Sequence, residues 1–217
     1  MLTLPIEAVT GTRQETRVLI VGRSENVLSE AVEILRAAGH AAGATNQFAD
    51  VMDLFDLTAV DIVVFGGMVP PDTKELLRGQ ISGRNPAITF IQGLAGIAGL
   101  IAAQVQASLT GDTRARSCLA VSYDPPTHTV RLHLDQPAHV QVTAWWATSF
   151  TPPEPRSTSR VLLGTRLQAG PHTVPLPEEI PAQASFVSVS AGDAVQVITV
   201  GPMPQLALLP VPQSRNA

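Results

Sequence analysis

Glycine and small polar residues follow each of four short apolar runs in the first half of the sequence, where they could bind an anion. Glycine lets a ligand approach the backbone, and the first turn of a helix presents unpaired N–H groups to a phosphate or carboxylate. An arginine among them could pair with such a group. The candidate ligand-binding residues are Gly22, Arg23, Ser24 and Asn26 after the first run, Asn46 after the second, Gly66 and Gly67 after the third, and Gln92 and Gly93 after the fourth.

A purely structural explanation fits the same residues. Glycines at strand ends make tight turns, and serine or asparagine commonly begins a helix. Glu25 lies in the first of these loops and would repel a phosphate placed against it. The sequence alone leaves both explanations open.

The sequence contains few residues that could bind a metal ion or act as a nucleophile. Cys118 is the single cysteine, so a disulfide within the chain and a multi-cysteine metal site are both excluded. Among the histidines of the second half, His133 shares a strand face with Arg131 and Asp135, and an adjacent arginine disfavours a cation. The G-x-S-x-G pattern of a nucleophile elbow does not occur. We therefore predict no metal site and no catalytic residues.

The elements that would position the candidate residues follow a (βα)₄ pattern. Apolar runs at 17–21, 41–45, 61–65 and 86–91 predict strands, and the third of them, DIVVF, has the composition of a strand buried on both faces. Helical spacing of apolar residues predicts helices at 27–38, 48–55 and 94–109. A further helix is predicted to begin at Asp72, because Glu75 follows three residues later in capping-box order. Crossover helices between apolar strands predict a parallel sheet. Residues 2–9 or the C-terminal tail could add an edge strand.

The pattern changes after residue 109. Seven short runs rich in Val, Thr and aromatic residues, separated by Pro and Gly turns, predict an antiparallel sandwich of immunoglobulin or fibronectin type. Trp145 and Trp146 must point to opposite faces, so we expect one in the sandwich core and the other outside it or against the first domain. The predicted organisation is an extension at 1–16, an α/β domain at 17–109, a linker at 110–117, a β-sandwich at 118–203 and a proline-rich tail at 204–217.

The segments RVLIVGRSENVLSEAVEILRAAGH, DIVVFGGMVPPDTKELL and PAITFIQG resemble the flavodoxin-like receiver domains of response regulators, and more loosely the Rossmann-like domain of short-chain dehydrogenases. A receiver carries an acidic pair after its first strand, where this chain has Gly22 and Arg23. The receiver's phosphorylated aspartate would fall near Phe65 or Gly66. The dehydrogenase pattern of tyrosine with lysine four residues later is also missing, because Tyr123 is the only tyrosine and a threonine stands at 127. The resemblance thus implies a fold without the family's chemistry.

The segment 93–109 carries no charge and is rich in small residues. A helix that is apolar nearly all round must be covered on most sides, and small residues allow close approach. The second domain or a second copy of the protein could supply the cover. We predict a homodimer, with this helix or the sheet edge beside it at the interface and with Gly96, Gly99, Leu100 and Ala103 as candidate contacts.

Charge and composition limit the other partners. Hydrophobic residues make up 45% and charged residues 15% of the 217 residues, with a net charge of −4, which disfavours nucleic acid and an anionic membrane surface. The N-terminal residues lack the basic start of a signal peptide. Residues 87–105 approach spanning length, but Pro86 before them and Gln92 and Gly93 within them favour a buried strand, turn and helix. We expect a cytoplasmic protein.

Two functions remain open. The first is a non-catalytic two-domain protein for assembly or regulation, with no cofactor and an unknown protein partner. The alternative is a nucleotide- or NAD(P)-binding enzyme with an atypical glycine loop.

Overall fold

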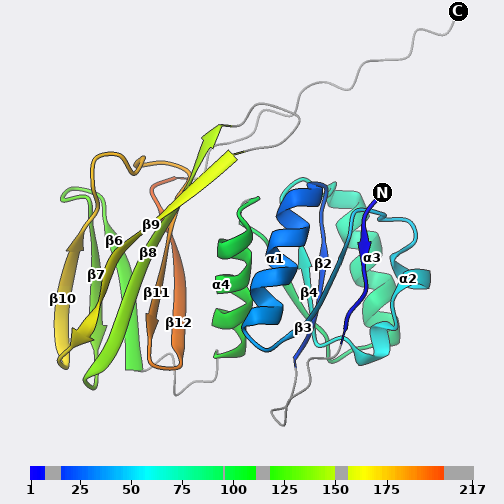
Figure 1. The fold of residues 1–217 in the computed structure, drawn as a ribbon, viewed down its shortest axis with the longest axis horizontal. Helices are drawn as coiled ribbons and strands as arrows, with labels where there is room; N and C mark the ends of the chain where they lie inside the picture. The colour runs from blue at the N-terminus through cyan, green and yellow to red at the C-terminus, as the bar shows by residue number, and fades with distance from the viewer. Residues whose placement is uncertain (8–15, 95, 111–117, 150–155, 203–217) are drawn as a thin grey trace, which may run out of the picture.

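The computed structural model describes residues 1–7, 16–94, 96–110, 118–149 and 156–202. An α/β domain and a β domain lie side by side, with the helix α4 (Ala98–Leu109) between them (Figure 1). The predicted fold class is therefore confirmed. The predicted linker beyond Thr110 and the predicted tail lie outside the described residues.

The described residues of the α/β domain form one sheet of five strands, in the order β1-β3-β2-β4-β5. The pairs β2–β3, β2–β4 and β4–β5 are parallel, as predicted, and β1 pairs antiparallel with β3. The N-terminal segment thus supplies the edge strand that the sequence left open. The strands are β1 (Thr3–Leu4), β2 (Arg17–Val21), β3 (Ala41–Thr45), β4 (Ile62–Phe65) and β5 (Thr89–Gln92).

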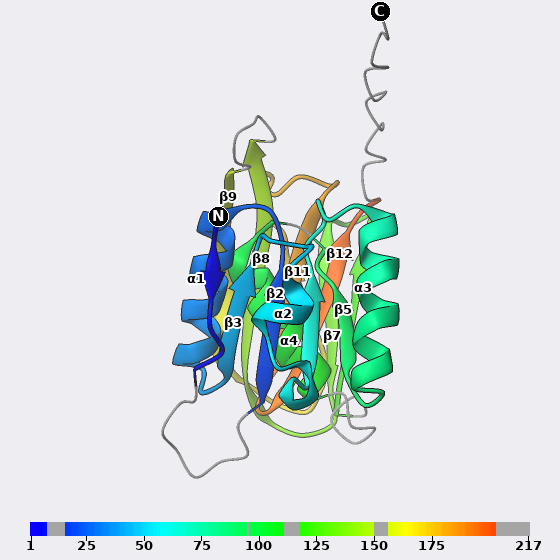
Figure 2. The ribbon, with the colours of Figure 1, turned by 90° about the vertical axis from the view of Figure 1, so that its right-hand side faces the viewer.

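Helices cover both faces of this sheet, which explains why its central strands are apolar throughout. Val18 and Ile20 of β2 face the helices α1 (Glu25–Ala37) and α4, whereas Leu19 and Val21 face the opposite layer. That layer contains α2 (Val51–Leu54), the 3₁₀ turn η1 (Leu57–Ala59) and α3 (Pro71–Arg84). Figure 1 shows α1 and α4 on one side of this sheet and α3 on the other, and Figure 2 views the sheet from the side of α2 and α3. The prediction that 61–65 is buried on both faces is confirmed for β4.

All four helices differ from their predicted boundaries, and α1, predicted at 27–38, extends over Glu25–Ala37. The helix α3 begins at Pro71 after Pro70 and has no side-chain cap, so the predicted capping box at Asp72 and Glu75 is wrong. Proline at the first helical position is favoured because its missing N–H would be unpaired there in any case. The helix α4 begins at Ala98 rather than at 94, since the preceding residue, Ile97, has extended dihedral angles. The helix α2 has only four residues, and η1 was not predicted.

In the described part of the second half, seven antiparallel strands in two sheets form the β domain. One sheet has the order β10-β7-β6 and the other the order β12-β11-β8-β9. Their inward side chains, such as Leu132, Val142 and Val189, form one buried core. The strands are β6 (Leu119–Asp124), β7 (Thr129–Leu134), β8 (Ala138–Ser149), β9 (Arg156–Leu167), β10 (Gly170–Pro175), β11 (Ser185–Ala191) and β12 (Ala194–Val200).

The two domains meet through α4 and the outer face of the β12-β11-β8-β9 sheet. Leu100 and Ile97 pack with Phe186 of β11, and Trp145 of β8 joins this cluster. The neighbouring Trp146 packs against the sandwich core, so the predicted division of the two tryptophans is confirmed. The close approach requires Gly99, because a Cβ there would lie 2.3 Å from ring atoms of Trp145.

Candidate functional site

The parallel strands end in a row of glycines. Gly22 follows β2, Gly66 follows β4 and Gly93 follows β5. The N–H of Gly66 donates to the carbonyl oxygen of Val21 at 2.8 Å, and the N–H of Gly93 donates to that of Phe65 at 2.8 Å. The N–H of Gly22 donates to the carbonyl oxygen of the last residue of β3 at 3.1 Å. These N–H groups complete the sheet and are not offered to an anion.

The same glycines are needed because neighbouring strand ends lie close together. A Cβ on Gly66 would lie 3.3 Å from Cα of Gly22, and a Cβ on Gly93 would lie 3.1 Å from the carbonyl oxygen of Phe65. Optimal carbon contacts lie at about 3.5–4.0 Å, so side chains would be crowded at both positions. Gly67 is exposed, and a Cβ there would lie no closer than 3.9 Å to its nearest neighbour, the carbonyl oxygen of Gly93. Packing of the sheet accounts for Gly66 and Gly93 without a ligand.

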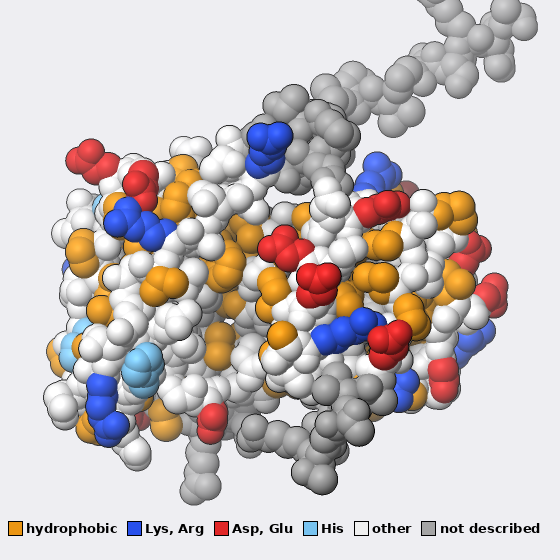
Figure 3. All heavy atoms as spheres, in the orientation of Figure 1, with side chains coloured by type: hydrophobic (Ala, Val, Ile, Leu, Met, Phe, Trp, Pro, Cys, Tyr) orange, Lys and Arg blue, Asp and Glu red, His pale blue; other side chains and the backbone are white. Residues whose placement is uncertain are grey.

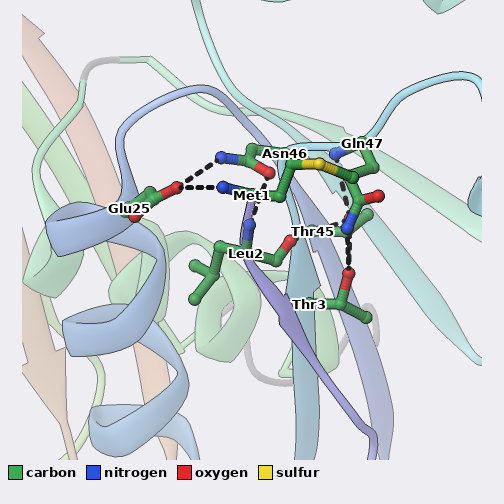
Figure 4. Close-up of polar contacts among 7 residues, drawn as sticks. All are labelled: Met1, Leu2, Thr3, Glu25, Thr45, Asn46 and Gln47. Atoms are coloured by element: carbon green, nitrogen blue, oxygen red, sulfur yellow. Dashed lines mark hydrogen bonds and ion pairs between the residues drawn. The ribbon is translucent and has the colours of Figure 1, made fainter.

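Asn46 is bonded to the protein's own groups at this edge (Figure 4). Its Oδ1 accepts a hydrogen bond from the N–H of Leu2 at 2.8 Å, and its Nδ2 donates to Oε1 of Glu25 at 3.0 Å. The amino group of Met1 donates to the same carboxylate oxygen at 3.1 Å. The segment that contains β1 is thus fastened to the loops after β2 and β3.

The carboxylate of Glu25 is ionised and is paired with the amino group of Met1. Hydrogen bonds from the amino group of Met1 and from Asn46 hold the pKa of the Glu25 carboxyl below its usual range. A lowered pKa keeps the carboxylate ionised at neutral pH. This carboxylate lies in the first turn of α1, two residues after Arg23, which is exposed in the preceding loop.

Gln92 also turns back onto the protein. Its Nε2 donates to the carbonyl oxygen of Phe65 at 3.2 Å and to that of Gly93 at 3.1 Å. Gln104 of α4 donates to the backbone carbonyl of Gln92 at 3.1 Å and accepts from the N–H of Leu94 at 3.2 Å. These bonds fasten the loop after β5 to α4.

Ser24 and Asn26 lie at the start of α1. Ser24 is its N-cap, and its hydroxyl accepts a hydrogen bond from the N–H of Val27 at 3.4 Å. Asn26 is exposed in the first turn. The fold therefore brings the glycines of three neighbouring strand ends together, and it gives Ser24, Asn46 and Gln92 structural roles.

The candidate interface residues lie on or just before α4. Leu100 is buried and Gly99 contacts Trp145, both within one chain. Gly96 is half-buried in the loop before the helix, and Ala103 is half-buried in a groove beside it. The β domain thus covers in cis the side of α4 on which Gly99 lies. The homodimer itself stays a prediction.

This groove, which we call the interdomain groove, has a volume of about 270 Å³ and runs between the two domains. Figure 3 shows the surface hollowed there. One wall comes from α1 and α4 and includes Ile34 and Ala102. The other wall comes from β8 and β11 and contains Gln141, Thr143, Trp145, Ser188 and Ser190.

Sequence reasoning missed the interdomain groove. The available signal was the alternation of Gln141, Thr143 and Trp145 along one strand, which places them on one face. The sequence does not show that this face turns toward the first domain.

The histidines of the second half lie in separate contacts. His133 Nε2 is 3.8 Å from Asp135, and His128 Nδ1 is 2.9 Å from the hydroxyl of Tyr123. Arg131 forms an ion pair with Asp124. Among the described residues, no three His, Cys, Asp or Glu side chains gather as a metal would require.

Comparison with known proteins gives no family. No family model matches the chain, and no curated protein matches it. A structural-genomics protein from Agrobacterium tumefaciens is 14% identical, with 91% of this chain and 100% of that chain covered and a TM-score of 0.31. A β-glucosidase from Listeria innocua, in complex with glucose, is 11% identical, with 94% of this chain and 49% of that chain covered and a TM-score of 0.28. Both scores are too low to transfer a function.

One further property concerns membranes. In the described part of the chain, no helix has the length and apolar character needed to cross a bilayer.

Proposed function

We propose that this is a non-catalytic two-domain protein that serves in assembly or regulation. The proposal depends mainly on the carboxyl edge of the parallel sheet. Ligands of open α/β sheets bind beyond the carboxyl ends of the strands. Here the N–H groups of Gly66 and Gly93 complete the sheet, and Asn46 and Gln92 are bonded to the protein itself.

The strand order supports a receiver-like origin for the first domain. The parallel strands follow the order β3-β2-β4-β5, which corresponds to the first four strands of the flavodoxin-like order 2-1-3-4-5. Phosphoryl transfer on such a sheet needs a carboxylate nucleophile and carboxylates that hold Mg²⁺. At the ends of β2 and β4 this chain has Gly22, Arg23 and Gly66. The combination favours a receiver-like unit that has no phosphoacceptor.

The second domain fits the same proposal. Its division into three and four antiparallel strands favours the predicted immunoglobulin or fibronectin type, a fold common in binding modules. The contact of Leu100 and Gly99 with Phe186 and Trp145 joins the two domains. A joined pair of domains suits a protein that presents one fixed surface to a partner.

A thermal-shift screen against nucleotides tests the proposal. We expect ATP, GTP, NAD⁺ and NADPH, each with Mg²⁺, to leave the unfolding temperature unchanged. The alternative enzyme with an atypical glycine loop predicts a rise of several degrees with one of them, because a ligand that binds only the native state stabilises it. Such a rise, lost in Gly22→Asp and in Arg23→Ala, would overturn the proposal. Arg23→Ala is the safer variant, since Arg23 is exposed whereas Gly22 is buried against Leu28.

A second test addresses the receiver-like unit directly. Incubation with acetyl phosphate and Mg²⁺ should leave the intact mass of the protein unchanged. An acid-labile phosphoryl adduct on an aspartate of the first domain would show that the unit retains a phosphoacceptor.

A further inference from the structure

The interdomain groove has two walls of opposite character. The wall from α1 and α4 is largely aliphatic, with Ile34, Leu35 and Ala102 among its residues. The wall from β8 and β11 offers the amide of Gln141 and the hydroxyl of Ser190, whereas the Ser188 hydroxyl is bonded to Trp145 and to the Thr143 carbonyl. A ligand that fits both walls needs one apolar face and an edge that bears hydrogen-bonding groups.

The side chains of this wall are more polar than those on the rest of the same sheet face. Where α4 covers this face, the sheet presents Phe186 and Val197, which pack with Leu100. Where it lines the groove, the same face carries hydroxyl and amide groups from β8 and β11 beside the ring of Trp145. The sheet thus changes from apolar to polar where the contact between the domains opens into the groove.

The polar side chains of this wall are held in place by the strands. Thr143 lies opposite Ser188 in the antiparallel register, and Gln141 lies opposite Ser190. The indole Nε1 of Trp145 donates to Oγ of Ser188 at 2.9 Å, and Gln141 Nε2 lies 3.4 Å from the Thr143 hydroxyl. Groups fixed on strands are positioned more precisely than groups on loops, which suits recognition.

The lining of the interdomain groove favours a neutral ligand over a charged one. None of the described residues that line the groove carries a charge. A charged ligand would lose hydration there without gaining a counter-ion. Hydroxyl and amide groups can both donate and accept, and so they match a ligand whose groups also do both.

The volume limits the size of the ligand. Pockets for drug-sized ligands measure about 300–1,000 Å³. The groove, at about 270 Å³, lies just below that range and suits a molecule with a single ring.

We propose that the interdomain groove binds a neutral, polyhydroxylated molecule of monosaccharide size. A sugar ring has an apolar C–H face, which fits the aliphatic wall beside Ile34 and Ala102. Its hydroxyl groups fit Gln141 and Ser190 on the opposite wall. Trp145 lies in the groove, so its fluorescence reports on occupancy. The groove is separate from the carboxyl edge of the parallel sheet. If it binds no sugar, the function proposed above is therefore unaffected.

The test uses the full chain carrying Trp146→Phe, which leaves Trp145 as the only tryptophan. Glucose, galactose, mannose and ribose are titrated against it, with glucose 6-phosphate and adenosine as charged and heteroaromatic competitors. We expect a saturable change in emission with at least one neutral sugar. Removing one hydrogen-bonding group should weaken binding by about three- to tenfold in Gln141→Ala and in Ser190→Ala.

A matched control is Gln80→Ala, which removes an exposed glutamine from α3 on the other side of the sheet. It should leave the affinity unchanged. The absence of a saturable response to every neutral sugar would overturn the proposal. So would saturation by glucose 6-phosphate or adenosine alone, or sugar binding that both groove variants leave intact.

Discussion

Replacing Gly99 by alanine tests the contact that joins the two domains. The new Cβ would lie 2.3 Å from two ring atoms of Trp145, far inside van der Waals contact. The ring cannot move away freely, because its Nε1 donates to Ser188 at 2.9 Å. Either the indole gives up this hydrogen bond or α4 moves away from the β domain.

The expected magnitude follows from two opposing effects. Alanine in place of glycine in a helix stabilises by about 0.5–1 kcal/mol. Overpacking of a close contact costs about 1–3 kcal/mol, and a lost hydrogen bond costs about 0.5–1.5 kcal/mol. Together these effects give a net loss of about 0.5–4 kcal/mol in the free energy of unfolding. Gly79→Ala in α3 is the matched control, because nothing lies within 4 Å of its added Cβ, and it should gain stability.

Urea unfolding followed by circular dichroism measures both variants, and in a Trp146→Phe background tryptophan emission reports on Trp145 alone. A second substitution, Trp145→Leu, should remove the clash and reduce the penalty of Gly99→Ala. If Gly99→Ala proved as stable as Gly79→Ala, with unchanged emission, the contact between the domains would not be as tight as described.

Three further predictions concern other parts of the fold. Gly43→Ala should lower stability by about 1–3 kcal/mol and speed amide exchange in β1, because its Cβ would lie 2.7 Å from the carbonyl oxygen of Leu4; an unchanged urea midpoint would contradict this. The hydroxyl and N–H of Thr58 donate hydrogen bonds to the Asp56 carboxylate and hold its pKa below the ordinary 3.8. These bonds therefore stabilise the fold above pH 3.8, and the stabilisation is lost as the pH falls through the pKa of the folded state. Asp56→Ala should therefore cost stability at pH 7 and progressively less below pH 3.8, and a pH-independent difference in urea midpoints would contradict the assignment. Light scattering should show the homodimer predicted from the sequence, with the exposed edge strand β5 as the remaining contact, and a monomer at tens of micromolar would refute it.

The sequence predicted the architecture because hydrophobic pattern determines it directly. The run at 61–65 has no polar face, and such a strand is stable only between two layers of helices. The alternation of Trp145 and Trp146 likewise predicted that the two rings lie on opposite faces. Helix starts were less accurate, since Pro70 and Pro71 displaced the expected cap and Ile97 remained extended.

The candidate sites were harder to predict because they depend on contacts between distant segments. A glycine such as Gly93 has the same appearance in sequence whether it admits a ligand or a neighbouring strand, and here it lies against Phe65. The cover of α4 could come from either the β domain or a second copy, and the sequence cannot distinguish them. The interdomain groove depends on how two domains pack, which no local pattern encodes.

Calorimetric titration with Mg·ATP and with NADH tests the central claim most directly, because it measures binding at the carboxyl edge without depending on stability. We expect no saturable heat, corresponding to dissociation constants weaker than about 1 mM. Saturable one-to-one binding that Arg23→Ala weakens, and that Arg166→Ala on the exposed strand β9 leaves unchanged, would contradict it.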